Sequence, residues 1–223
     1  MARPASVAVL GTGTVGQTVA DALLALGHTV TMGSRTADNP TAATWAARHT
    51  DAAAHATFAE AAVRSELVVN ATSGAASLAA LEAVGAPSLA GKVLLDISNP
   101  LDFSQGFPPS LSVCNTDSLG EQIQRRFPEA RVVKALNTVT AAVMVEPTLL
   151  AAPSDLFVAG DDAAAKSTVV DLLVSFGWHR ERVRDLGGIT AARAMEMYLP
   201  LWLQLFGATG SPVFNIAVVP AHG

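Results

Sequence analysis

The chain has 223 residues, of which 50% are hydrophobic and 15% are charged, and it carries a formal net charge of -5 at pH 7. This length suits one main domain, and so apolar a composition suits a sheet that is buried on both faces. The acidic balance argues against general binding to nucleic acid or to an anionic membrane. Cys114 is the single cysteine and the histidines lack the spacing of metal ligands, so we expect no disulfide and no metal site.

The first predicted element is an apolar strand over residues 5–10, which ends in glycines at the i, i+2, i+5 spacing before a helix over about 14–26. Gly11 permits a tight turn, Gly13 lets the backbone approach a pyrophosphate, and Gly16 lets the helix pack closely on the strand. The N-terminal amides of the helix then face the phosphates. A plain strand–helix turn is the alternative, because glycine-rich turns are common. We predict a dinucleotide site at Gly11, Thr12, Gly13, Thr14, Val15 and Gly16.

The second predicted strand, His28 to Gly33, is followed by Ser34-Arg35-Thr36. Dinucleotide sites for NAD usually carry an acidic residue here, which binds the ribose 2′-hydroxyl. A guanidinium and two hydroxyls can instead donate to a 2′-phosphate, so we predict that Ser34, Arg35 and Thr36 select NADP(H). A turn with a solvated arginine is the alternative interpretation, and Asp38 could reach the ribose if the turn were shifted.

The rest of the chain continues to alternate between strands and helices. Further strands are predicted at Glu66–Ala71, Lys92–Ile97, Arg131–Leu136 and Asp155–Ala159. Further helices are predicted at Thr41–His49, Thr57–Arg64, Ala75–Val84, Ser118–Phe127 and Ala163–Phe176. This alternation predicts an α/β fold, a Rossmann-type doubly wound parallel sheet with a small C-terminal helical segment.

Small polar residues follow three of the predicted strands. In doubly wound sheets the ligand lies at the carboxyl ends of the strands, so these residues can contact the nicotinamide and its ribose. Helix capping is the alternative for any one of them, because Ser, Thr and Asn also cap helices. As a group we predict that they bind the cofactor: Ala71, Thr72, Ser73, Asn99, Pro100, Asn137 and Thr138.

No acid–base machinery is recognisable, neither a Ser-His-Asp order nor a Tyr-x-x-x-Lys pair. Lys134 lies in a predicted strand, where its ammonium could turn towards the strand end or snorkel to the rim of the sheet. We therefore predict no catalytic side chain. Direct hydride transfer between two bound cofactors fits best, because that chemistry belongs to the cofactors and the protein only positions them.

Four segments together resemble the NADPH-dependent coenzyme F420 reductases, the F420H2:NADP+ oxidoreductases. They are the glycine motif, Gly33-Ser34-Arg35-Thr36, Lys134-Ala135-Leu136-Asn137-Thr138 and Gly160-Asp161-Asp162. The resemblance covers nearly the whole chain and implies that Thr12, Ser34 and Arg35 hold the 2′-phosphate of NADP(H). It further implies that the deazaflavin F420 stacks on the nicotinamide, in a cleft closed by the C-terminal helices. Such enzymes are typically homodimers built through the C-terminal helical part.

At position 137 this chain has asparagine, whereas the archaeal members of the family carry a histidine there. This position lies in the region that faces the deazaflavin in those members. Asp96-Ile97-Ser98-Asn99-Pro100 and the run after Lys134 also resemble the reductase domain of the STEAP metalloreductases, which pass hydride from NADPH to an ordinary flavin. The alternatives for the acceptor are therefore FMN, FAD or another small molecule. A non-enzymatic NADP(H)-binding regulator would keep the glycine loop, whereas an imine or β-hydroxyacid reductase would need a larger substrate domain.

Two domains are predicted, an NADP-binding Rossmann domain over 1–185 and a C-terminal helical segment over 186–223 that closes the cleft and dimerises. The apolar face Met195, Leu199, Trp202, Leu203 and Phe206 suits either core packing or a dimer interface, and 213–219 suits a final strand or an extended tail.

The first residues, Met1-Ala2-Arg3-Pro4, are followed by a predicted strand and not by an apolar leader, so we expect no signal peptide. The apolar run 197–207 is too short to cross a bilayer. We therefore expect a cytoplasmic protein with small-molecule cofactors as its ligands.

Overall fold

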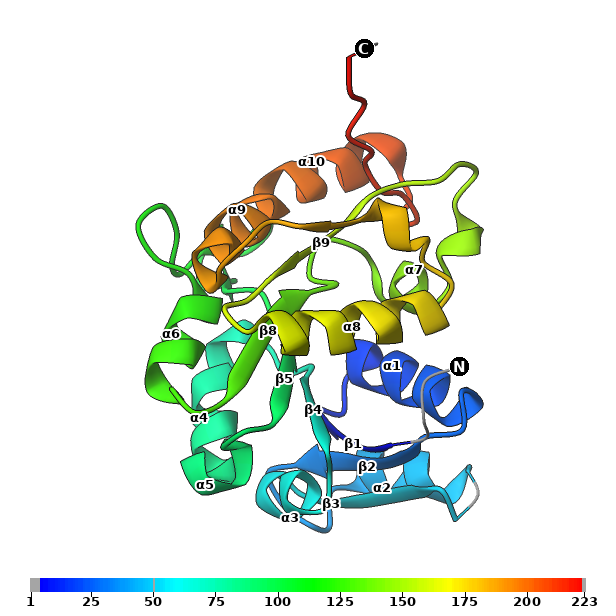
Figure 1. Cartoon of the computed structure of the whole chain (residues 1–223), viewed down its shortest axis with the longest axis vertical. Coiled ribbons are helices and arrows are strands. Elements are labelled where there is room, and N and C mark those ends of the chain that lie inside the picture. Colours follow the sequence, from blue (N-terminus) through cyan, green and yellow to red (C-terminus); the bar gives the residue numbers. More distant parts are fainter. Residues whose placement is uncertain (1–4, 50, 222–223) are drawn as a thin grey trace.

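An eight-stranded sheet with the order β10-β9-β8-β5-β4-β1-β2-β3 forms the centre of the computed structural model, which describes residues 5–49 and 51–221 (Figure 1). Most of its strands run parallel. These are β1 (Ser6–Leu10), β2 (Thr29–Ser34), β3 (Ala53–Thr57), β4 (Leu67–Asn70), β5 (Val93–Asp96) and β8 (Arg131–Ala135). The predicted α/β fold is confirmed.

Helices cover both faces of the sheet. Successive strand residues point to opposite sides, and both sides are apolar, so each needs a covering layer. Val7 and Val9 of β1 belong to one apolar cluster, and Ala8 and Leu10 belong to the other. The first cluster is covered by α1 (Thr14–Ala25), α2 (Pro40–Ala47), α7 (Ala141–Val145) and α8 (Ala163–Ser175). The second is covered by α3 (Phe58–Val63), α4 (Gly74–Val84), α5 (Ala86–Leu89) and α6 (Leu119–Arg126).

The sheet departs from the predicted all-parallel arrangement at one edge. Strand β9 (Leu156–Ala159) pairs antiparallel with β8, and β10 (Val183–Asp185) pairs parallel with β9. The last two strands therefore run against the other six. Strand–helix alternation alone does not define strand direction, so the sequence could not exclude this reversal.

Two strands of the sheet, β3 and β10, lie in segments that we did not predict to be strands. Strand β3 has the sequence Ala-Ala-His-Ala-Thr, which lacks the β-branched and aromatic residues typical of a strand, and it forms by pairing with β2. The run 213–219 is extended but pairs in neither sheet, so of the two interpretations the tail is correct. Residues 1–4, part of the segment in which we expect no signal peptide, lie outside the described residues.

The C-terminal helices α9 (Ala192–Met197) and α10 (Leu199–Thr209) lie across the end of the molecule beyond α6 and β9, and the chain leaves past α10 (Figure 1). A small hairpin, β6 (Leu101–Asp102) with β7 (Ser110–Leu111), follows β5. No helix among the described residues is both long enough and apolar enough to span a bilayer.

The strand order reverses direction between β1 and β4, because the chain builds β2 and β3 on one side of β1 and then crosses to the other. Ligands of doubly wound sheets bind in the crevice outside the carboxyl ends of the strands at such a point. The glycine motif follows β1 and Ala71 follows β4, so both lie at this crevice.

Candidate functional site

The glycine loop between β1 and α1 has the geometry that its sequence requires. Gly11 has a φ of 117°, and a Cβ there would lie 2.6 Å from the carbonyl oxygen of Ala71. A Cβ on Gly16 would lie 2.1 Å from the carbonyl oxygen of Gly11, so only glycine permits the close contact of helix and loop. A Cβ on Gly13, in contrast, would meet no atom within 4 Å. The space beside Gly13 is thus open, as the approach of a pyrophosphate would need.

The N-terminus of α1 is free to receive an anion. Gly13 is its N-cap and supplies no side chain to accept from the first amides of this 12-residue helix. Gln17 supports the loop from within the helix, because its Nε2 donates to the carbonyl oxygen of Thr12 at 2.9 Å. The first-turn amides and the positive end of the helix dipole therefore face the crevice, with no side-chain cap from the described residues.

The end of β2 carries the residues predicted to select NADP(H). Ser34 is 4% exposed and its hydroxyl donates to the carbonyl oxygen of Thr36 at 2.6 Å, which tightens this turn. Arg35 and Thr36 are exposed, and Arg35 forms no ion pair with any residue that the structure describes. The guanidinium is therefore available to an incoming phosphate.

A cavity of about 780 Å³ lies at the carboxyl ends of β4, β5 and β8, next to the glycine loop. It contains most of the strand-end residues predicted from the sequence, whereas Pro100 is buried outside its lining. The predicted residues that line it are Thr14, Val15, Ala71, Thr72, Ser73, Asn99, Asn137 and Thr138. The structure therefore brings residues from three strand ends and from the start of α1 to one cavity.

Asn99 and Asn137 join the ends of β5 and β8 through their side-chain amides. Asn99 Nδ2 donates to the carbonyl oxygen of Asn137 at 2.8 Å, and Asn137 Nδ2 donates back to Asn99 Oδ1 at 2.9 Å. Asn137 Nδ2 also donates to the carbonyl oxygen of Met195 in α9 at 3.1 Å. One amide thus fixes two strand ends and the C-terminal segment relative to one another.

Lys134 forms the centre of a buried charge network behind this cavity, and its side chain is fully buried. Its Nζ lies 2.8 Å from Asp96 Oδ2, 2.8 Å from Glu196 Oε1 and 2.5 Å from the carbonyl oxygen of Ser98. The three N–H donors of the ammonium thus have three acceptors. The ammonium faces the strand end and does not reach the rim of the sheet, which settles the choice that the sequence left open.

Each carboxylate of the network has further donors. Glu196 accepts from the backbone N–H groups of Leu119 and Gly120 at the start of α6, at 2.8 and 3.0 Å. Asp96 Oδ1 accepts from Asn70 Nδ2 at 2.8 Å and from the Ser98 hydroxyl at 2.6 Å. Burial lowers the pKa of Lys134, but the carboxylates of Asp96 and Glu196 outweigh it and hold the pKa above its usual value. The lysine therefore stays charged and serves as a structural cation.

Some residues of the site were not predicted. Glu196 reaches the network from 77 positions beyond Leu119, and nothing in the local sequence signals such a contact. Trp202 lines the cavity from α10, although we expected it in the core or in a dimer interface. Gly74 was also missed, and a Cβ there would lie 1.9 Å from the carbonyl oxygen of Asn99, a contact that only the fold creates. Glycine at the start of α4 is therefore needed where two strand-end loops touch.

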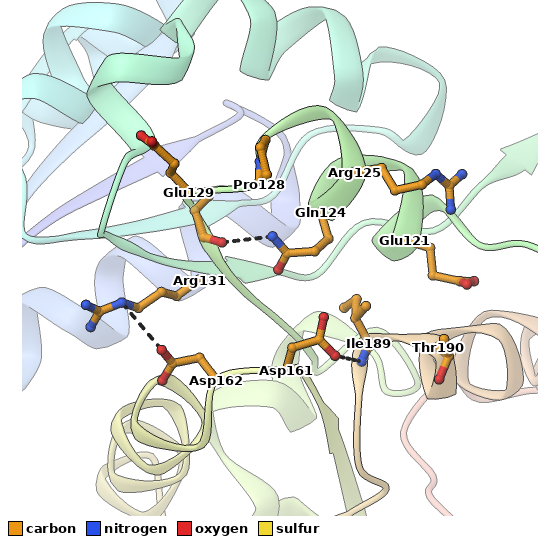
Figure 2. Close-up of a pocket in the computed structure, with 11 residues that line it drawn as sticks. Glu121, Gln124, Arg125, Pro128, Glu129, Arg131, Asp161, Asp162, Ile189 and Thr190 are labelled. Atoms are coloured by element: carbon orange, nitrogen blue, oxygen red, sulfur yellow. Dashed lines mark hydrogen bonds and ion pairs between the residues drawn. The ribbon is translucent and has the colours of Figure 1, made fainter.

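A second hollow of about 730 Å³ lies at the amino-terminal end of β8, and Asp161 and Asp162 line it because they follow β9, which runs antiparallel to β8 (Figure 2). Its polar groups bind one another: Asp161 accepts from the Ile189 N–H at 2.9 Å, and Asp162 lies 3.5 Å from Arg131. Gly160-Asp161-Asp162, part of the family resemblance, therefore lies far from the glycine loop in the fold. Its contacts indicate a structural role.

Comparison with known proteins agrees with this geometry. The family model "NADP oxidoreductase coenzyme F420-dependent" matches residues 6–100. A candidate F420-dependent NADP reductase of Arthrobacter sp. FB24 is 53% identical, and its crystal structure superposes with a TM-score of 0.92 over 97% of this chain and 100% of that chain.

Two more distant proteins share parts of the same architecture. The metalloreductase STEAP3 of Rattus norvegicus is 31% identical over 206 residues, which are 88% of this chain and 37% of STEAP3, so the chain spans well under half of that relative. A reductive aminase from Aspergillus terreus, solved with NADPH and ethyl levulinate, is 20% identical with a TM-score of 0.63. The match covers 93% of this chain and 63% of the aminase, and it shows the fold alone.

The fold and these relatives define the protein as an NADP-dependent oxidoreductase of Rossmann type. Within that class, the chain belongs to the coenzyme F420-dependent NADP oxidoreductase family.

Arg35→Ala is expected to weaken NADPH binding by roughly 1.5–3 kcal/mol, because a charged hydrogen bond to the 2′-phosphate is lost. NADH lacks this phosphate, so its affinity should change far less. Titration of both nucleotides gives the two dissociation constants. Arg64→Ala, at another exposed arginine just after α3, serves as the control. Equal weakening of NADPH and NADH by Arg35→Ala would remove Arg35 from the 2′-phosphate site.

Proposed function

We propose that this chain transfers a hydride between NADP(H) and the deazaflavin coenzyme F420 by direct cofactor-to-cofactor transfer. The hydride moves between nicotinamide C4 and deazaflavin C5, and in the direction of F420 reduction the deazaflavin takes its proton from water. The glycine loop would hold the pyrophosphate, and Arg35 and Thr36 would hold the 2′-phosphate on a turn that the Ser34 hydroxyl tightens. The strand-end residues that line the cavity after β4 and β5 would orient the nicotinamide.

The observation that carries the proposal is the chemistry of the cavity lining. Among its described residues, Asp102 is the one acidic or basic side chain, and it lies in the hairpin strand β6. The backbone N–H of Ser104, which donates to Asp102 Oδ1 at 2.8 Å, holds the pKa of that carboxyl below its usual range. Asp102 therefore stays ionised and unsuited to donate a proton. A positioned hydride transfer needs no such donor from the protein.

The size of the cavity also supports a second substrate. Cavities of roughly 300–1,000 Å³ hold drug-sized ligands, and this one, at about 780 Å³, has room for a ring system beside the nicotinamide. Apolar side chains such as Ile97, Met144 and Leu199 contribute to its lining. A planar aromatic ring system is thus a suitable occupant.

The test is spectroscopic. Protein, NADPH and oxidised F420 are mixed, and the loss of deazaflavin absorbance is followed; the assay is then repeated with FMN and FAD. We expect turnover with F420. Turnover with FMN or FAD alone would favour the flavin alternative, which the similarity to STEAP3 supports. Tight NADPH binding without turnover of any acceptor would contradict the proposal.

We also propose that the protein is a homodimer formed through α10. This helix is strongly apolar, yet Leu199 is the single buried residue among its members, and Leu201 is 55% exposed. An apolar helix face of this kind usually contacts a partner. The helical segment over 186–223 would then both close the cleft and dimerise. Light scattering coupled to size-exclusion chromatography measures the mass, and a monomer would contradict this assignment.

A further inference from the structure

Three buried polar atoms on residues that line the cavity have no hydrogen-bond partner among the described residues. They are Asn137 Oδ1, Thr138 Oγ1 and Trp202 Nε1. Asn137 is 3% exposed and Thr138 is 2% exposed. Buried polar side-chain atoms in folded proteins are almost always paired, so an unpaired group in a cavity points to a missing ligand or water.

The orientation of the Asn137 amide determines what its free atom can do. Its Nδ2 donates to the carbonyl oxygen of Met195, which can only accept, so a flipped amide would place two oxygens against each other. Both N–H groups are used, one on Met195 and one on Asn99 Oδ1. Oδ1 is therefore fixed as a pure acceptor. Its missing partner must be an N–H or O–H donor.

Trp202 presents the complementary requirement, because an indole N–H can only donate. The ring is held between Phe206 and Phe214, with centroids 5.7 and 5.4 Å away and interplanar angles of 27° and 24°. The indole is thus packed in place and its donor lacks an acceptor. The hydroxyl of Thr138 can act in either role. A ligand that pairs with both Asn137 and Trp202 must therefore carry a donor for the amide oxygen and an acceptor for the indole N–H.

These atoms belong to the part of the site furthest along the sheet from the glycine loop. Strand β8, which Asn137 and Thr138 follow, is separated from β1 by β5 and β4, and neighbouring strands are about 4.8 Å apart. Asn137 is moreover hydrogen-bonded to Met195 of α9, and Trp202 belongs to α10. A ligand other than the pyrophosphate-bound half of the nucleotide would meet them.

We propose that Asn137, Thr138 and Trp202 recognise the imide edge of the second substrate, the N3–H flanked by two carbonyls that flavins and deazaflavins share. This inference rests on the proposed function, because it assumes a second ring system in the cavity. Asn137 Oδ1 accepts from N3–H, and Trp202 Nε1 donates to a flanking carbonyl. Nicotinamide has a similar edge in its carboxamide, and the experiment separates the two.

The experiment compares a 5-deazariboflavin with its N3-methyl derivative, both titrated against the wild-type protein saturated with NADP+. Methylation removes the donor and adds bulk, so we expect affinity to fall about tenfold or more. The deazaflavin's own fluorescence reports binding. Trp202→Phe keeps an aromatic ring but removes the donor, and it should weaken both compounds by about tenfold while leaving NADP+ affinity unchanged.

Three results would overturn the inference. Equal affinity for the parent and the N3-methyl compound would mean that water, and not an imide, satisfies Asn137. Weaker binding of NADP+ to Trp202→Phe, with deazaflavin binding unchanged, would assign the edge to the nicotinamide carboxamide. Unchanged binding of all ligands to Trp202→Phe would leave the indole without a role in recognition. If the protein binds both compounds with equal affinity and reduces both rapidly with NADPH, this inference alone is overturned. If NADPH reduces no deazaflavin or flavin, the proposed function is overturned.

Discussion

Lys134→Met is expected to lower the free energy of unfolding by about 3–5 kcal/mol, because it leaves the carboxylates of Asp96 and Glu196 buried without their cation. Urea denaturation measures this change. The pKa of Lys134 lies above its usual value in the folded protein. Its ion pairs therefore contribute fully to the free energy of unfolding at pH values below the pKa of the lysine in the unfolded chain. This contribution is lost as the pH rises through the pKa of the folded state. The lysine's own contribution to the stability of the wild type should therefore stay constant from about pH 6 to about pH 9.

Lys166→Met provides a matched control. Lys166 Nζ also lies 2.8 Å from a carboxylate, that of Asp185, but this aspartate side chain is 55% exposed. An exposed pair contributes about 0–1 kcal/mol, so the same substitution should cost little. A similar decrease in the free energy of unfolding for both variants would show that burial does not determine how much the Lys134 network stabilises the fold. Glu196→Gln added to Lys134→Met should recover part of the loss, since one uncompensated charge is removed.

Gly13→Val is expected to abolish binding of both NADPH and NADH while the fold survives. Gly13 has φ -77° and ψ -178°, which valine adopts without strain, and a Cβ there meets no protein atom within 4 Å. The branched side chain would instead fill the space that the pyrophosphate needs. Isothermal titration with each nucleotide measures binding, and the thermal unfolding midpoint measures the fold.

The control for this substitution is Gly207→Val in α10, where a Cβ also meets nothing within 4 Å. Nucleotide binding should persist in this variant, because Gly207 lies outside the glycine loop. Retained affinity in Gly13→Val would place the pyrophosphate elsewhere. Loss of the folded state in Gly13→Val would show instead that the loop cannot adapt to any side chain at this position.

The parts of the fold that could be predicted are those whose signals are local. The strand, glycine loop and helix at the start of the chain follow from a few neighbouring residues, and β1 and α1 form where the pattern indicates. Strand β3 was missed because its alanine-rich sequence is a strand only through its pairing with β2. The reversal of β9 was missed because direction depends on how a long connection crosses the sheet.

The candidate site shows the same division. Residues at strand ends could be chosen because one topological rule brings strand ends together, and most of them line the cavity. Lys134 was left with two possible orientations, because the partners that decide between them, Asp96 and Glu196, are distant in sequence. The reciprocal amide bonds of Asn99 and Asn137 likewise join residues 38 positions apart, which no periodicity reveals.

Glu196 places a condition on the order in which this protein folds. Its carboxylate binds the first amides of α6, 76 and 77 residues earlier, and completes the coordination of Lys134. A ribosome adds residues in order, so the sheet up to β8 is made before Glu196. Until then the first amides of α6 lack their carboxylate acceptor, and Lys134 lacks one of its partners. Domains generally fold as units during synthesis. Here the last cation–carboxylate contact of the Lys134 network can form only after residue 196 has been made, so closure of this network must follow the synthesis of α9.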